Sequence, residues 1–267
     1  MLLAPKPDKA YKKSVRPFPP KKNSSSAQDN WIWGEHSVEA CLETKPESIL
    51  EIFVEKKASH ALSRLGKKLE GFQYSYVEKL PRFLAEKRTQ GVAAKIKEFP
   101  VYGIEKFYEK DLSKKRQILI LDRVQDIQNF GAILRSAAAL GAQEVIIGSR
   151  EQAPVNGTVA QVSAGNIFKL DIYVCHNLAK TCEKLKELDF ELFALDSGGV
   201  TLEQALTASQ GASIGWILGS EEDGIQNLVS KIAHKKVGIP MLPGVESLNV
   251  SNSAAIALYA GSQKLKA

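Results

Sequence analysis

Short apolar runs alternate with amphipathic stretches along most of the chain, and this alternation predicts two α/β units. The first unit covers residues 31–99. Its apolar runs predict strands at residues 31–33, 49–54, 72–77 and 91–96, and helices at residues 37–42, 58–69 and 80–87. Residues 100–116 mix charged and aromatic side chains without a period, which is typical of a linker.

The second unit, residues 117–267, has the pattern of a buried parallel sheet. Its strand-like runs are apolar throughout, as expected for strands that helices cover on both faces. The predicted strands lie at residues 118–122, 145–147, 173–175, 192–195, 216–218 and 237–239, and the predicted helices at 130–140, 178–188 and 254–264. The fold class is therefore α/β, and ligands of such sheets gather beyond the carboxyl ends of the strands.

Composition narrows the cellular setting. In 267 residues, 44% of them hydrophobic, no apolar run approaches the ~20 residues that cross a bilayer, and the N-terminus lacks the apolar core of a secretory signal. We therefore expect a soluble cytoplasmic protein without a membrane partner. Cys41, Cys175 and Cys182 show no CxxC spacing and no accompanying histidine cluster, so we expect neither a disulfide framework nor a metal site.

The net charge of +6 is concentrated at the N-terminus. Residues 1–30 hold seven basic and two acidic residues, which leaves a single positive charge for the rest of the chain. They also hold five of the eleven prolines and three consecutive serines, so we expect this arm to be disordered. A flexible cationic arm suggests phosphate contacts, while a solubilising tail or a targeting segment would explain it equally well.

Three polar segments follow predicted strands. The first runs from Asn129 at a helix entry to Arg135, and the second, Leu218–Gly224, is an acidic turn bounded by glycines. An Asn at a helix N-cap is common for purely structural reasons, so the first segment alone is weak evidence of function, and a solvated helix cap explains the second almost as well as function does. The third, Ile239–Ser251, combines a Pro/Gly turn with a polar helix start, and it carries more polar side chains than a simple loop requires.

In this order the three segments resemble the three motifs of the SpoU (TrmH-like) branch of the SPOUT RNA methyltransferases, over about residues 117–263. The resemblance implies an S-adenosylmethionine-dependent ribose 2′-O-methyltransferase with a deep trefoil knot. Residues 33–40 and 89–92 resemble the small L30e-like substrate-binding domain that precedes many such enzymes. This favours methylation of a guanosine in large-subunit (23S) ribosomal RNA over the single-domain enzymes that act on transfer RNA.

The resemblance also implies the site residues. The family positions whose backbone surrounds the methyl donor match Gly219, Ile239 and Leu248, and Leu218 and Met241 adjoin the adenine pocket. The polar positions of the active site match Asn129, Arg135, Glu221, Ser247 and Asn249. Because a guanidinium is effectively never deprotonated, we expect Arg135 to clamp phosphate and stabilise the developing alkoxide. The proton would leave to substrate phosphate, water or Glu221, and no metal is required.

Relatives are homodimers whose knotted regions form the interface, and the same is expected here. One segment departs from the family pattern, because Gln161 stands where many relatives carry Lys and no carboxylate follows Gly165. We interpret these as RNA-side contacts. The alternatives that stay open are a transfer RNA substrate, a non-catalytic RNA-binding factor of ribosome assembly, and a nucleotide-binding α/β protein without RNA chemistry.

Overall fold

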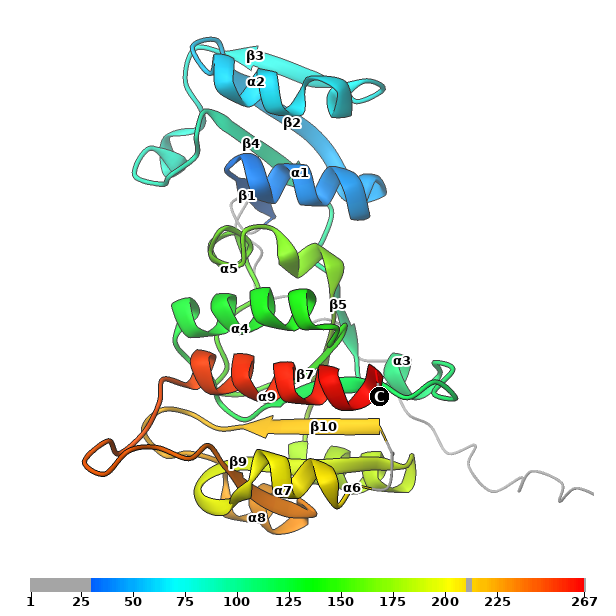
Figure 1. Cartoon of the computed structure of the whole chain (residues 1–267). Helices are drawn as coiled ribbons and strands as arrows, with labels where there is room; N and C mark the ends of the chain where they lie inside the picture. The colour runs from blue at the N-terminus through cyan, green and yellow to red at the C-terminus, as the bar shows by residue number, and fades with distance from the viewer. Residues whose placement is uncertain (1–29, 210–212, 267) are drawn as a thin grey trace, which may run out of the picture.

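The computed structural model describes residues 30–209 and 213–266, which form two stacked α/β units (Figure 1). Apart from Asn30, the predicted basic arm lies outside the described residues. The first unit is a four-stranded sheet of order β1-β4-β2-β3. Its elements are β1 (Trp31–Trp33), α1 (Glu35–Thr44), η1 (Pro46–Ser48), β2 (Ile49–Glu55), α2 (Ser59–Leu65), η2 (Gly66–Leu69), β3 (Tyr74–Val77), η3 (Arg82–Leu84) and β4 (Val92–Ile96).

The helix predicted at residues 80–87 is wrong, because only the single turn η3 forms there. Pro81 at its entry disfavours a helical conformation for the preceding Leu80, so a helix cannot begin earlier. The rest of this connection is irregular, and Gln90 has a left-handed backbone (φ 54°) just before β4.

The second unit confirms the predicted parallel sheet. Within the described residues it has seven strands in the order β11-β9-β10-β6-β7-β8-β5, and every neighbouring pair is parallel. Its elements are β5 (Val101–Gly103), α3 (Glu105–Tyr108), β6 (Gln117–Leu121), α4 (Ile127–Leu140), β7 (Glu144–Gly148), α5 (Gly157–Val162), η4 (Asn166–Lys169), β8 (Asp171–Cys175), α6 (Leu178–Glu187), β9 (Phe190–Thr201), α7 (Leu202–Thr207), β10 (Ser213–Leu218), α8 (Asn227–Ile232), β11 (Lys235–Gly238) and α9 (Val250–Lys266).

Helices cover both faces of this sheet (Figure 1). The core on one face joins α4, α5, α7 and α9 to the strands, and it continues without a break into the first unit. The core on the other face joins α3, α6 and α8 to the strands. The core on one face of the second sheet is therefore continuous with a core of the first unit.

Residues 100–116 are not the bare linker that their sequence predicts. Val101–Gly103 pair with β8 as an edge strand, and Phe107 of α3 is fully buried. A three-residue strand paired on one side only leaves little periodic signal between charged neighbours. The connection between the units is thus built into the second sheet.

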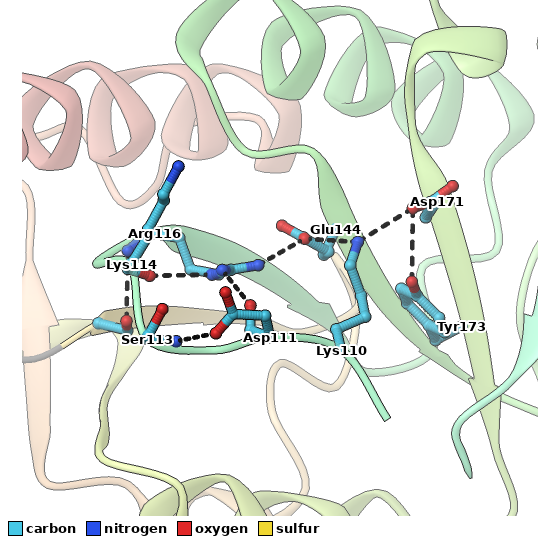
Figure 2. Close-up of polar contacts among 9 residues, drawn as sticks. Lys110, Asp111, Ser113, Lys114, Arg116, Glu144, Asp171 and Tyr173 are labelled. Carbon is cyan, nitrogen blue, oxygen red and sulfur yellow. Dashed lines mark hydrogen bonds and ion pairs between the residues drawn. The ribbon is translucent and has the colours of Figure 1, made fainter. Parts of the chain in front are cut away.

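Polar contacts fix the end of this connection to the starts of β7 and β8 (Figure 2). Glu144, only 4% exposed, forms ion pairs with Lys110 at 2.8 Å and with Arg116 at 3.1 Å. Lys110 also contacts Asp171 at 3.1 Å. Burial opposes the charged form of Lys110, but the hydrogen bond and charge of Glu144 outweigh it and raise the pKa of the ammonium.

The buried amide of Gln117 holds α4 and α9 side by side. Its amide nitrogen, Nε2, donates to Leu140 O at 2.7 Å and to Leu258 O at 3.1 Å. Its Oε1 accepts from Trp216 Nε1 at 3.1 Å. Leu140 is the last residue of α4, and Leu258 lies within α9. Trp216 belongs to β10, a strand of the sheet that these two helices cover. Both helices consequently begin at the same edge of the sheet (Figure 1).

His234 extends the sheet at the start of β11. Its backbone N–H donates to Leu192 O at 2.8 Å, and its Nδ1 accepts from Leu192 N–H at 2.9 Å. An accepting Nδ1 carries no proton, so the imidazole in this contact is neutral. Burial, and after it the charge of Lys186, lowers the pKa of His234.

We predict that acidification weakens this contact. A His whose folded pKa is depressed contributes stability that is complete above its unfolded pKa of about 6.5 and is lost as the pH falls through the folded value. The urea midpoint should therefore fall between pH 7 and pH 5. In His234→Asn the side-chain oxygen can still accept from Leu192 but does not titrate, so this pH dependence should flatten. An equal fall in the variant would contradict the role given to His234.

Candidate active site

Three chain segments meet at the carboxyl edge of the second sheet. The strands β6 and β10 are parallel neighbours with Leu121 opposite Leu218, and Asp122 N–H donates to Leu218 O at 2.8 Å. The start of α4 therefore lies beside the turn Gly219–Gly224. The third segment, residues 239–249, reaches the same place before α9 begins.

One carboxylate joins these segments. Glu221 Oε1 accepts from Asn129 Nδ2 at 2.7 Å and from Asn249 Nδ2 at 2.9 Å, and Asn249 Nδ2 also donates to Asn129 Oδ1 at 2.9 Å. We call these residues the Asn129–Glu221–Asn249 cluster. Each comes from a different one of the three polar segments that the sequence singled out, and tertiary folding brings them into direct contact.

Helix capping explains why these two amides can reach the carboxylate. Asp126, not Asn129, caps α4, and its side chain accepts from Asn129 N–H at 2.7 Å. The interpretation of Asn129 as the cap is therefore wrong, and its side chain is available to Glu221. Asn249 does precede α9 as a cap: its Oδ1 accepts from Ser251 N–H at 2.9 Å while its amide nitrogen holds the cluster.

A cavity of about 380 Å³ lies beside the cluster. It is lined by predicted site residues from two of the motifs: Leu218, Gly219, Glu221, Ile239, Met241, Ser247, Leu248 and Asn249. It is also lined by Leu195, Asp196 and Ser197 of β9, which the sequence analysis did not name. The polar run that follows the apolar start of β9 was the available signal, since it marks another strand reaching this edge.

A second cavity, of about 180 Å³, lies on the other side of the cluster. Asn129 lines it together with Arg123, Asp126 and Asp223. Glu221 lines both cavities, as do Ser220 and Val250. The carboxylate is thus positioned between two recesses, one larger and partly apolar, and one smaller and polar.

The glycine at residue 219 has a structural cause. A Cβ built there would lie 2.1 Å from the carbonyl carbon of Gly224, because residues 220 and 224 pair as an antiparallel bridge. The fold of this turn accounts for the glycine by itself. This tight turn also places the Glu221 carboxylate within hydrogen-bonding distance of Asn129 and Asn249.

Arg135 is the one predicted polar residue that the structure leaves apart. It is exposed on α4 and forms no hydrogen bond or ion pair with any residue that the structure describes. It follows Asn129 by six residues, which is about 9 Å along the helix and a different face. Within one copy of the chain, Arg135 is not part of the cluster.

The described residues include no group of three or more His, Cys, Asp or Glu side chains arranged to hold a metal ion. The three cysteines are buried and free, and burial raises the pKa of the Cys41 and Cys182 thiols to about 12. No described helix is long and apolar enough to cross a membrane.

Residues 116–259 match the model of the SpoU rRNA Methylase family, and residues 31–102 match a model described as RNA 2′-O ribose methyltransferase substrate binding. The chain belongs to the SpoU rRNA methylase family. This confirms the resemblance found in the sequence. A SpoU methylase is a methyltransferase, and the chain is an enzyme of that class.

Other SpoU methylases share most of the length of this chain. It is 32% identical to the 23S rRNA (guanosine-2′-O-)-methyltransferase RlmB of Acinetobacter baylyi, over 87% of this chain and 96% of that protein. It is 35% identical to RlmB of Bordetella pertussis, over 85% and 94%. Its fold is similar to that of the SpoU methyltransferase AviRb from Streptomyces viridochromogenes in complex with the cofactor AdoMet, with a TM-score of 0.72, 20% identity, and coverage of 88% and 89%.

The larger cavity suits the methyl donor of SpoU methylases, S-adenosylmethionine. Its volume lies in the range of small-molecule sites, and Leu218, Ile239 and Leu248 would offer apolar walls to an adenine bound there. Asp196 and Ser247, which also line the cavity, would offer polar groups to the ribose and amino-acid parts. Bound there, the donor supplies an activated methyl group on a sulfonium centre.

Asn249→Ala should separate the role of the cluster from that of a helix cap. We expect kcat for methyl transfer to fall at least tenfold, because Glu221 and Asn129 lose the amide that joins them; tenfold corresponds to about 1.4 kcal/mol. Loss of the cap should also cost about 1 kcal/mol of stability.

The matched control is Asn177→Ala. Asn177 caps α6, with its side chain accepting from Lys180 N–H at 3.0 Å, and it lies outside both cavities. It should lose similar stability in urea denaturation and keep its turnover. Equal kcat values for the two variants would contradict a role for Asn249 beyond capping.

Proposed function

We propose that this SpoU methylase transfers a methyl group to the ribose 2′-hydroxyl of a guanosine in large-subunit (23S) ribosomal RNA. The observation that carries the proposal is the position of Glu221, whose carboxylate lines both the cavity suited to the donor and the smaller polar cavity. A ribose in the second cavity would meet the donor at the cluster. The substrate class is supported by the RlmB relatives and by the match of residues 31–102.

The cluster would act by positioning and by electrostatics. Transfer requires the 2′-oxygen in line with the methyl carbon, and a fixed set of hydrogen-bonding groups reduces the entropy cost of that alignment. Asn129 and Asn249 hold the Glu221 carboxylate, whose free oxygen can accept the ribose hydroxyl. Glu221, substrate phosphate or water then takes the proton as the new C–O bond forms.

The direct test measures transfer of labelled methyl from S-adenosylmethionine to unmodified RNA. Large-subunit ribosomal RNA and transfer RNA are compared, and the product is mapped by its resistance to alkaline cleavage, which requires a free 2′-hydroxyl. We expect one protected ribosomal guanosine, and no product with Glu221→Ala. Product in transfer RNA alone would replace the proposed substrate, and binding of the donor without product on either RNA would favour the non-catalytic assembly role.

We also propose that two copies of the chain pair through α9 and the preceding loop. Large apolar side chains are exposed on both: Leu242 (80%), Val245 (51%) and Tyr259 (59%). Arg135 lies on α4, which packs against α9, and it has no hydrogen bond or ion pair with the described residues of its own copy. In a symmetric pair it would extend to the other copy, where it would clamp a substrate phosphate at the cluster.

Mixing two inactive variants tests this pairing. Arg135→Ala and Glu221→Ala should each abolish transfer while retaining donor binding. Co-refolded in equal amounts, half of the pairs are mixed, and each mixed pair has one intact site of two, so about a quarter of wild-type activity should return. Mixed pairs without activity, or an active Arg135→Ala variant alone, would contradict a contribution across the interface.

The deep trefoil knot, the cytoplasmic location and the RNA contacts of the basic arm stay predictions. So do the domain limits inferred from the sequence.

A further inference from the structure

The connection between β3 and β4 is residues 78–91, and its first residue, Glu78, pairs with Lys56. The remainder, which we call the 79–91 loop, carries a net positive charge. It holds four basic residues, Lys79, Arg82, Lys87 and Arg88, against the single acidic Glu86. Arg82 and Arg88 are exposed, and their side chains form no hydrogen bond or ion pair with described residues. This positive charge is local, because residues 31–267 together carry almost no net charge.

Three cations elsewhere in the first unit are already paired with carboxylates. Lys56 pairs with Glu78, and Arg64 and Lys68 both pair with Glu39. The guanidinium groups of Arg82 and Arg88, in contrast, have no hydrogen bond or ion pair with any described residue that would account for them. A polyanion gains affinity from such groups by releasing its counterions.

This loop is held against the methylase unit. Gln161 Nε2 of α5 donates to Arg88 O at 2.7 Å. Gln161 was interpreted as an RNA-side contact, but its amide is used at the contact between the two units. Close by, a Cβ on Gly157 would lie 2.2 Å from Trp31 O and 2.3 Å from the Trp33 ring, so α5 packs on β1 at its backbone.

A second contact fixes the orientation of the first unit. A Cβ on Gly165 would lie 2.5 Å from His36 O of α1, and Phe168 stacks on Phe99 with ring centroids 6.0 Å apart. Together with the anchored connection of Figure 2, these contacts leave no free linker between the units.

The segment before α5 connects the contact between the two units to the candidate active site. Gln152, just before α5, exchanges two hydrogen bonds with the backbone of Val124, at 3.1 and 2.8 Å. Val124 lines the smaller cavity. The exposed Arg150 lies in the same connection, again without a side-chain partner among described residues. In Figure 1 the 79–91 loop is on the side of the molecule toward which β10 points, where the cluster lies.

We propose that the 79–91 loop, with Arg150, grips the phosphates of RNA that flank the methylated nucleotide, at a distance from Glu221 fixed by the docking of the two units. The proposal rests on the proposed function and adds to it the means of selecting one ribose. Gln161, Gly157 and Gly165 are positioning residues, because they act by placing the loop. The RNA path runs from the loop across Arg150 to the smaller cavity.

The first test removes the charge. Arg82→Ala/Arg88→Ala is compared with Lys115→Ala/Lys231→Ala, which removes the same charge from exposed residues outside both cavities and away from the loop. The probe is a transcript of large-subunit ribosomal RNA. In the loop variant the slope of log K against log salt should decrease by about 1.4–1.8, and KM for RNA should rise about tenfold or more, with unchanged S-adenosylmethionine affinity. The control should keep the wild-type slope.

The second test changes the docking without touching the charge. Gly157→Ala favours its own helix, yet its Cβ would collide with the first unit; in the control Gly66→Ala the Cβ would meet nothing within 4 Å. Gly157→Ala should expose residues 97–116 to limited proteolysis, raise KM for RNA and spread methylation over neighbouring riboses. When Arg82→Ala/Arg88→Ala is combined with Gly157→Ala, it should raise KM for RNA by a smaller factor than it does in the wild type.

The outcomes separate this proposal from the proposed function. A wild-type salt slope and KM in the loop variant, with methylation intact, would overturn the grip alone. An unchanged product pattern and full additivity in Gly157→Ala would overturn the fixed distance. Absence of methylation by the wild type would overturn the proposed function, while RNA binding and its salt slope would still decide whether the loop grips RNA.

Discussion

The parallel pairing of β6 with β10 is the constraint on which the rest of the site depends. Because parallel neighbours end at one edge, Leu121 and Leu218 deliver the start of α4 and the acidic turn to the same place. The Gln117 amide then holds α9 against α4, which brings the third segment to that edge. A shift in this pairing would move all three segments together or separate them.

At this edge a carboxylate is satisfied by two amides rather than by a cation. Glu221 accepts from Asn129 and Asn249, and it stays accessible from the cavities on both sides. Amide donors orient the carboxylate without neutralising it. The proposed positioning of a ribose hydroxyl rests on this arrangement. Arg135, which has no partner among the described residues, lies on a different face of α4 from Asn129.

The departure of this chain from the family pattern has a structural consequence. Gln161, which the resemblance places at a Lys position of the family, and Phe168 both join the methylase unit to the smaller one. With a shared core and an anchored connection, the smaller unit acts as a fixed part of the enzyme. Substrate selection can then depend on geometry as well as on contacts.

The sequence by itself determined the parallel sheet, the order of its strands along the chain and the three polar segments, because apolar runs and turn residues are local signals. It also gave the family, through residues such as Glu221 and Asn249. Only the tertiary structure decided that Asp126 rather than Asn129 caps α4, that Val101–Gly103 complete the sheet, and that Gln161 faces a second unit. The edge strand and the Gln161 contact depend on partners distant in the chain, and local patterns do not record which distant residues will meet. The cap is local, but it depends on the residue at which the helix begins, which the apolar pattern does not fix.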